Sequence, residues 1–244
     1  MTLSVDVGAT SIKAAAVGPD GGLAGPVRRR RTRYPIDPDG LVAVVTELAG
    51  MLPRASRAAM GFPGLVRHGC VVSAANLARS GGPGTPLDED LVRRWDGFDL
   101  AGAVAGALGV EVRVANDADV AALSCSTGVG VELTVTLGSG VGTGLVVDGR
   151  LAPHLELSEL ALGGVACLDD LVGERVRKGL DPAEWDARVV AVIDQLDRIV
   201  RFDRCALTGG NARRLRRDAL GELLERVVVV GDDAGLSGGV RLFD

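Results

Sequence analysis

The strongest constraint on the fold is an Asn-Asp pair that directly follows a short apolar run. Val110 to Val114 reads as a strand, Asn116 and Asp117 follow it, and the apolar stretch 120–123 reads as a helix. A strand that turns into a helix in this way holds a carboxylate at the carboxyl edge of an α/β sheet, where such sheets bind ligands. A carboxylate there can accept a proton from a substrate hydroxyl. The alternative is that Asp117 or Asp119 only caps the helix.

Composition favours a folded protein with a sizeable core. Hydrophobic residues make up 47% of the 244 residues, which argues against disorder. The formal net charge of -5 argues against a protein that binds polyanions with its whole surface. No apolar run approaches ~18 residues, and no charged-then-apolar leader opens the chain. We therefore expect a soluble, cytoplasmic protein with no membrane partner.

Cysteine and histidine usage argues against a zinc site. The four cysteines are far apart and form no CxxC pair, and His68 and His154 are the only histidines. Structural zinc sites need closely spaced cysteine and histidine ligands. We therefore expect no zinc, and cysteines without pairing spacings suit a reducing cytosol.

A first glycine turn lies close to the N-terminus. Leu3 to Val7 and Ile12 to Val17 read as two strands joined by Gly8-Ala9-Thr10-Ser11. The backbone N–H groups and hydroxyls of such a turn can bind phosphate oxygens. Asp6 lies at its mouth and Lys13 just beyond it. Taken alone, the pattern is more often that of an ordinary hairpin with a polar turn.

A second glycine turn spans residues 138–144, after the apolar strand 132–137. A dinucleotide-binding fingerprint would require a helix next, but residues 145–151 read as a strand with an Asp-Gly hairpin turn. No GxxxxGK[ST] motif occurs, which excludes a P-loop. The segment is therefore a counterpart of the first hairpin. Two such hairpins that face each other can grip one phosphoryl group from both sides.

Two segments of the chain are densely basic. Arg28 to Arg31 with Arg33 suits either a solvated edge strand that discourages strand pairing or an anion-binding patch. We favour the edge strand, because no aromatic residues interleave as a nucleic-acid groove requires, and we expect no nucleic-acid partner. The second segment, Arg213 to Arg217, is predicted to lie on a helix after the sharp turn Thr208 to Asn211. That turn would offer N–H groups to an anion or a nucleotide.

The motifs together resemble the sugar kinases of the ROK family, and most of all its short members, which are similar to polyphosphate glucokinases. The resemblance runs from residue 3 to about residue 240 and is specific in motif order and spacing, although no single motif is. It is carried by DVGATSIK, GFPG, NDAD, LGSGVGTG, ELSE and TGGN.

The resemblance implies an α/β fold of the actin-like, ribonuclease-H-like ATPase type, with two lobes and a central cleft. We expect a smaller N-terminal lobe at residues 1–110, which holds the first phosphate loop. A larger C-terminal lobe at residues 111–244 would hold the aspartate, the second phosphate loop and the donor loop, and its last helix can pack back on the first lobe. ROK repressors carry a DNA-binding region before the first phosphate loop, and we expect none here because that loop begins at Asp6.

The resemblance also implies an activity and a set of roles. The protein would be a carbohydrate kinase that transfers a phosphoryl group from polyphosphate or ATP to a hydroxyl of a glucose-like hexose, with Mg²⁺ as cofactor and a homodimer as its assembly. Asp117 would be the general base, and Asp6 would help to hold the magnesium ion. The sugar would be bound by Gly64, Asn76, Asn116, Glu156 and Glu159. The donor phosphates would be bound by Asp6, Gly8, Thr10, Lys13, Gly138, Ser139, Gly140, Thr143, Gly209, Gly210 and Asn211.

One motif departs from the family pattern. Where the family has Glu-x-Gly-His, this chain has Glu156-Leu157-Ser158-Glu159. An ionised glutamate only accepts hydrogen bonds, and it adds a negative charge. The substrate could therefore be an aminosugar or an amino-cyclitol, or Glu159 could turn outward or pair with an arginine while glucose is still accepted. A third account is a non-catalytic sugar-binding regulator. The intact NDAD motif and both phosphate loops favour an enzyme.

Overall fold

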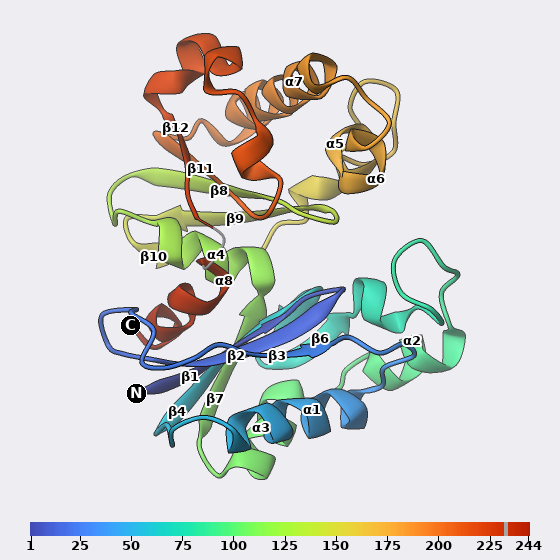
Figure 1. The fold of residues 1–244 in the computed structure, drawn as a ribbon, viewed down its shortest axis with the longest axis vertical. Helices are drawn as coiled ribbons and strands as arrows, with labels where there is room; N and C mark the ends of the chain where they lie inside the picture. Colours follow the sequence, from blue (N-terminus) through green and yellow to red (C-terminus); the bar gives the residue numbers. More distant parts are fainter. Residues whose placement is uncertain (232–233) are drawn as a thin grey trace. The chain divides into compact units, whose positions relative to one another are not determined.

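The computed structural model describes residues 1–231 and 234–244, and this part of the chain divides into two compact units (Figure 1). The first unit comprises Met1–Val120 and Gly235–Asp244, and the second comprises Ala121–Ala234. The boundary lies after Val120 rather than after residue 110, because the strand that ends at Asn116 pairs within the first sheet. The second unit is also the shorter of the two, not the larger.

The first unit is built on a five-stranded sheet with the strand order β3-β2-β1-β4-β7. Strand β2 runs antiparallel to both of its neighbours, β1 and β3, whereas β1, β4 and β7 run parallel to one another. A small hairpin of β5 and β6 lies outside this sheet. The elements are β1 (Thr2–Val7), β2 (Ser11–Val17), β3 (Arg28–Arg31), α1 (Pro38–Gly50), β4 (Arg57–Phe62), β5 (Leu65–Arg67), β6 (Cys70–Ser73), α2 (Glu89–Trp95), α3 (Leu100–Leu108) and β7 (Glu111–Asn116).

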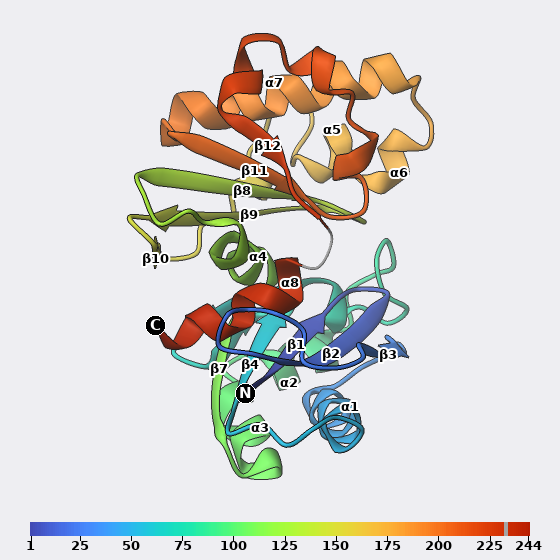
Figure 2. The same ribbon diagram turned by 60° about the vertical axis from the view of Figure 1, so that its left-hand side comes forward.

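Helices cover both faces of the first sheet. On one face, apolar residues of α1 and α3 such as Leu41 and Leu100 pack into the main core with Val5 and Met60. The other face receives the end of the chain, α8 (Ala234–Ser237) and a 3-10 helix over Gly238–Phe243, as Figures 1 and 2 show. Val240 joins the buried cluster on that face. The C-terminal segment therefore completes the core of the first unit.

The second unit repeats the strand plan of the first. Its sheet has the order β10-β9-β8-β11-β12, with β9 antiparallel to both β8 and β10 and with β8, β11 and β12 parallel to one another. This repeated plan is the one expected of an actin-like fold. The elements are α4 (Asp117–Cys125), which crosses the boundary between the units, β8 (Val131–Leu137), β9 (Val141–Val147), β10 (Arg150–Leu151), α5 (Asp169–Val172), α6 (Glu174–Arg177), α7 (Pro182–Val200), β11 (Arg204–Thr208) and β12 (Val227–Val229).

The long helix α7 covers one face of the second sheet. Asp181 caps it by accepting the Ala183 N–H at 2.8 Å, and Pro182 occupies its first position, where a missing N–H costs nothing. Trp185, Val189 and Ile193 recur at helical spacing and are buried in the core. The predicted helix over Arg213 to Arg217 does not form. A 3-10 turn spans Ala212–Arg214, and a nine-residue 3-10 segment with a kink at Gly221 spans Arg217–Glu225.

None of the helices in the described part of the chain is long and apolar enough to cross a membrane.

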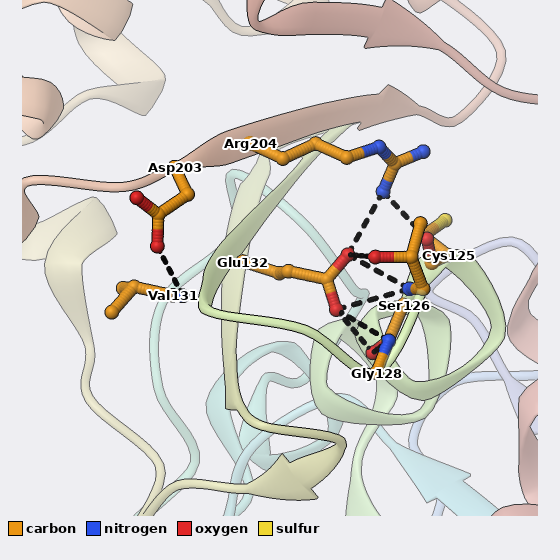
Figure 3. Close-up of polar contacts among 8 residues, drawn as sticks. Cys125, Ser126, Gly128, Val131, Glu132, Asp203 and Arg204 are labelled. Carbon is orange, nitrogen blue, oxygen red and sulfur yellow. Dashed lines mark hydrogen bonds and ion pairs between the residues drawn. The ribbon is translucent and has the colours of Figure 1, made fainter.

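A buried glutamate ties three elements of the second unit together (Figure 3). Glu132 on β8 accepts hydrogen bonds from the Thr127 N–H at 2.8 Å, the Gly128 N–H at 3.0 Å and the Ser126 hydroxyl. The Arg204 guanidinium on β11 lies 3.3 Å from the same carboxylate and also donates to the carbonyl of Cys125, the last residue of α4, at 2.7 Å. Burial alone would raise the pKa of Glu132, but these hydrogen bonds bring it below its ordinary value.

We expect Glu132→Gln to lower the free energy of unfolding by about 3 kcal/mol, because it removes the charge that these donors surround and leaves the Arg204 pair broken. Urea denaturation at neutral pH measures the change. Glu111→Gln is the matched control, since it breaks an exposed pair with Arg113 and is expected to cost about 0.5 kcal/mol or less. Equal losses in the two variants would contradict this assignment.

Candidate active site

The first unit brings several of the predicted sugar and donor residues, together with Asp117, to one edge of its sheet. The parallel strands β1, β4 and β7 are in register, with Asp6 paired to Gly61 and Gly61 paired to Ala115. The segments that follow these strands therefore leave the sheet at the same carboxyl edge, which is the ligand-binding edge of α/β sheets. These segments contain Gly8, Thr10, Gly64, Asn116 and Asp117.

Asn116 and Asp117 form the junction between β7 and α4. The buried Asn116 side chain donates to the Gly64 carbonyl at 3.1 Å and accepts the Ala118 N–H at 2.8 Å. It thereby caps the first turn of α4 and links the junction to the GFPG segment. Asp117, which is half-buried, also accepts the Ala118 N–H, at 2.9 Å. Asn116 and Asp117 thus share the Ala118 N–H at the start of α4.

Two glycines allow the close approaches at this edge. A Cβ at Gly61 would lie 3.2 Å from the Asp117 Cα, so any side chain there would press on the start of α4. A Cβ at Gly64 would lie only 2.1 Å from the Ser73 carbonyl oxygen. Sequence reasoning identified Gly64 but gave no role to Gly61, whose signal is a glycine inside a strand. Asn76, the remaining predicted sugar residue of this unit, lies half-buried in the 3-10 turn Ala75–Ala78.

The first glycine turn joins β1 to β2, as predicted. Lys13 and Asp6 lie directly opposite each other on these strands, and the Lys13 Nζ is 3.1 Å from an Asp6 carboxylate oxygen. Their side chains are 27% and 19% exposed, so the pair is shielded but reachable. On the C-terminal segment, Gly235 approaches the Asp6 carboxyl group so closely that a Cβ there would lie 3.3 Å from the Asp6 Cγ. Sequence reasoning missed Gly235.

The second glycine turn is packed against the TGGN segment within the second unit. The Asn211 side chain donates to the Gly138 carbonyl and to Glu174, each at 2.9 Å. Gly209 has a φ of +90°, and a Cβ there would lie 2.6 Å from the Leu137 carbonyl oxygen, so only glycine fits. The structure therefore brings Gly138, Gly209 and Asn211 together, and Ser139 and Gly210 are exposed beside them.

A carboxylate that sequence reasoning did not identify packs against this second turn. Asp169, at the start of α5, accepts the Val141 N–H, and a Cβ at Gly140 would lie 2.6 Å from the same carboxylate. Burial raises the pKa of Asp169. Thr143, which is predicted to bind phosphate, is buried in β9, where its hydroxyl donates to the Leu155 carbonyl at 3.2 Å.

The ELSE segment, also in the second unit, is exposed. Glu156 precedes the 3-10 turn Leu157–Glu159 and Glu159 is its last residue, and both are exposed to solvent. Glu156 lies 3.2 Å from the Nε2 of the buried His154, and this hydrogen bond is the main cause of a lowered pKa of Glu156. Sequence reasoning missed His154 as the partner of Glu156, although side chains at positions i and i+2 of an extended chain lie on the same side.

Comparisons with known proteins assign the chain to a family. The model of the ROK family matches residues 2–153, which is more than half of the chain. The chain belongs to the ROK family. This ROK protein is 26% identical over 220 residues to the polyphosphate glucokinase of Mycobacterium tuberculosis, and the match covers 86% of this chain and 77% of that one.

Solved structures agree with the expected fold. The crystal structure of inorganic polyphosphate/ATP-glucomannokinase from Arthrobacter sp. strain KM matches with a TM-score of 0.80 and 26% identity, over 98% of this chain and 96% of that chain. A ROK family glucokinase from Streptomyces griseus, in complex with glucose and AMPPNP, matches with a TM-score of 0.79 and 18% identity, over 99% and 98% of the two chains. The predicted actin-like α/β fold is thereby confirmed.

The stability of this ROK protein should fall in acid through Glu174, which supports the second turn through Asn211. The hydrogen bond from Arg177 is the largest cause that lowers the pKa of Glu174 from 4.5 to about 2. A carboxyl whose pKa is lowered on folding stabilises the fold above its ordinary pKa, and that stabilisation is lost as the pH falls from about 4.5 to about 2. We expect Glu174→Gln to be less stable than the wild type at pH 7 and to approach it at pH 3, as measured by thermal unfolding. A difference that stays constant with pH would contradict this expectation.

Glu184→Gln is the control, because Glu184 forms an exposed pair with Arg188 on α7. Its effect on the unfolding midpoint should be small at both pH values.

Proposed function

We propose that this ROK protein is a hexose kinase that transfers a phosphoryl group from polyphosphate or ATP to a hydroxyl of a glucose-like sugar. The observation that carries the proposal is the shared carboxyl edge, where Asp117 follows β7 and the first glycine turn follows β1 in the same sheet. Phosphoryl transfer needs a positioned acceptor, neutralised donor charge and a base near the attacking oxygen, and these residue types supply all three.

In the proposed reaction, Asp117 accepts the proton of the sugar hydroxyl as the oxygen attacks the terminal phosphorus. We assign sugar binding to Asn116, Asn76, the Gly64 segment and Glu156. Because Asn116 is fixed by its bond to Gly64 at 3.1 Å, the residue beside it is held in place as well. Such fixed geometry is what lowers the barrier when a catalyst does little covalent chemistry.

Magnesium fits the first turn with a single protein carboxylate. No group of three or more His, Cys, Asp or Glu side chains within the described residues could hold a metal by itself. In phosphoryl-transfer sites, however, Mg²⁺ is usually bound by one or two carboxylates together with phosphate oxygens and water. We propose that Asp6 is that carboxylate, and the ion would neutralise charge on the donor phosphates.

The exposed position of Glu159 supports glucose as a substrate. An exposed carboxylate carries little desolvation cost and places no buried, uncompensated charge in the protein. A coupled assay over glucose, mannose, glucosamine and cyclitols, with each donor, tests this account. Preferred turnover of glucosamine would instead favour the aminosugar kinase, and sugar binding without any turnover would favour the regulator.

We expect Asp117→Asn to lower turnover by about 10²- to 10⁴-fold, because the amide cannot accept the proton, while the affinity for the sugar stays within about tenfold. The coupled assay measures turnover, and equilibrium binding measures affinity. Asp99→Asn is the control, since Asp99 caps α3 of the same unit by accepting the Gly102 N–H at 2.8 Å. Near wild-type turnover in Asp117→Asn would remove the base assignment.

The register of β3 supports polyphosphate as a donor. Arg29 pairs with Lys13 and Arg31 pairs with Ser11, so these arginines share a sheet face with the basic residue of the first turn. Neither Arg29 nor Arg31 has an acidic partner among the residues that the structure describes. Along one face they follow one another at roughly 7 Å, which suits a linear chain of phosphates.

The opposite face of β3 is neutralised. Arg30 pairs with the buried Ile12, and its guanidinium donates to Glu47 of α1 at 2.5 and 3.0 Å. Arg30 and Glu47 also line a cavity of about 450 Å³, together with Arg31 and Arg33. The strand thus has the edge position that the sequence predicted, with one face whose arginines are left for an anion.

We expect the double variant Arg29→Gln/Arg31→Gln to raise the KM for polyphosphate by about tenfold at low ionic strength and to leave the KM for ATP unchanged. Arg28→Gln/Arg30→Gln removes the same charge from the other face and is the matched control. Steady-state kinetics with both donors over a range of salt concentrations measures the effect. An equal rise in both double variants would contradict a role for this face, and turnover with ATP alone would restrict the donor to ATP.

A further inference from the structure

The first glycine turn is fixed by hydrogen bonds from the segment 32–34, which contains none of the recognised motifs. Three successive carbonyl groups of the turn accept hydrogen bonds from the residues that follow β3. The Thr32 hydroxyl donates to the Gly8 carbonyl at 2.7 Å, and the Thr32 N–H donates to the Thr10 carbonyl at 3.1 Å. The Tyr34 hydroxyl donates to the Ala9 carbonyl, which lies between them, at 2.9 Å.

These three bonds fix the direction of the N–H groups in the turn. A trans peptide is planar, so its N–H points away from its C=O. With the carbonyls of Gly8 and Ala9 directed toward Thr32 and Tyr34, the N–H groups of Ala9 and Thr10 are directed to the opposite side. Within the described residues, neither of these N–H groups donates to any acceptor of the chain. Adjacent open N–H groups of this kind bind anions.

We propose that Thr32 and Tyr34 are positioning residues that hold the Ala9 and Thr10 N–H groups open for a phosphate of the phosphoryl donor. The inference rests on the proposed kinase function and adds to it the residues that set the shape of the donor site. Neither side chain touches the donor in this scheme. Each side-chain hydroxyl donates one hydrogen bond to a backbone carbonyl of the turn. The two residues therefore affect the donor only through the backbone of the turn.

Tyr34 is itself held in place by a second glycine-rich segment. Gly82, with a φ of +90°, lies against the tyrosine ring, and a Cβ at this position would come within 2.6 Å of it. The segment around Gly82 is closed by the Thr85 hydroxyl, which donates to the Gly82 carbonyl at 2.7 Å. Burial also raises the pKa of Tyr34, so its hydroxyl keeps its proton at neutral pH and remains a donor to Ala9.

The competing account is that these bonds only stabilise the unit, as many side chain to backbone bonds do. The two accounts differ in what they change. A purely stabilising role predicts a lower unfolding midpoint with normal donor binding in the folded protein. A positioning role predicts weaker donor binding with normal sugar binding, at temperatures where every variant is fully folded.

The test uses Thr32→Val and Tyr34→Phe, alone and combined, in the full-length protein. Thr32→Ser keeps the hydroxyl and serves as the conservative rescue. Thr46→Val is the matched control, because Thr46 donates to the Val42 carbonyl at 2.8 Å on α1, away from the turn. Calorimetric titration with ATP and with inorganic tripolyphosphate gives donor affinity without turnover. Steady-state kinetics then separates the KM for donor from the KM for sugar, and thermal unfolding reports stability.

We expect the combined variant to bind both donors about tenfold more weakly, with the KM for sugar unchanged and with Thr32→Ser and Thr46→Val close to the wild type. Unchanged donor affinity in the combined variant would overturn the inference while leaving the kinase proposal intact. Equal weakening of donor and sugar would also overturn it, since that pattern reports general disruption. A wild-type protein that bound neither donor would overturn the kinase proposal and the inference together.

Discussion

The arrangement of the first unit depends on the parallel pairing of β1, β4 and β7. Because Asp6, Gly61 and Ala115 lie in one row across these strands, the chain leaves all of them at the same edge. The edge can be crowded only because Gly61 has no side chain to meet the start of α4, whose Asp117 Cα would lie 3.2 Å from a Cβ there. Packing of α1 and α3 on one face and of the C-terminal segment on the other keeps the three strands in register. The proposed chemistry therefore rests on backbone pairing and on the absence of one side chain.

A protein of net charge -5 that binds phosphates must neutralise them locally. In the first unit, Lys13 lies 3.1 Å from Asp6, so the donor turn carries a paired charge and not a bare carboxylate. On β3, the pairing partners divide the arginines between two faces. Arg30 is satisfied by Glu47, whereas Arg29 lies opposite Lys13 on the strand beside it. The net charge of the chain thus says little about its proposed ligand. Binding of an anion depends on the local charge of one sheet face, which is set by the side chains that share that face.

Much of the site could be predicted from the sequence because its motifs are local. The two glycine hairpins, the strand that ends at Asn116 and the helix that follows it are each specified within about ten residues by apolar periodicity and turn chemistry. What the sequence did not reveal depends on contacts between distant segments. Thr32 and Tyr34 lie 24 and 25 residues from the carbonyls that they bind, on a segment placed there only by the pairing of β3 with β2. The burial of Thr143 was not foreseen for a related reason, because it depends on strand β9 beginning at Val141 and on the Leu155 carbonyl, which accepts the Thr143 hydroxyl.

The two glycine turns follow the same strand plan, yet their backbones are satisfied in opposite ways. In the first, the carbonyls accept hydrogen bonds from Thr32 and Tyr34. The N–H groups of Ala9 and Thr10 have no acceptor among the described residues. In the second, Asn211 holds the Gly138 carbonyl, but the Val141 N–H donates to the Asp169 carboxylate. Burial raises the pKa of Asp169, so ionising this group is costly unless that N–H bond is kept. A phosphate at the Val141 N–H would have to displace a carboxylate, whereas a phosphate at the first turn would displace nothing from the protein. We infer that the first turn provides the stronger anion site of the two.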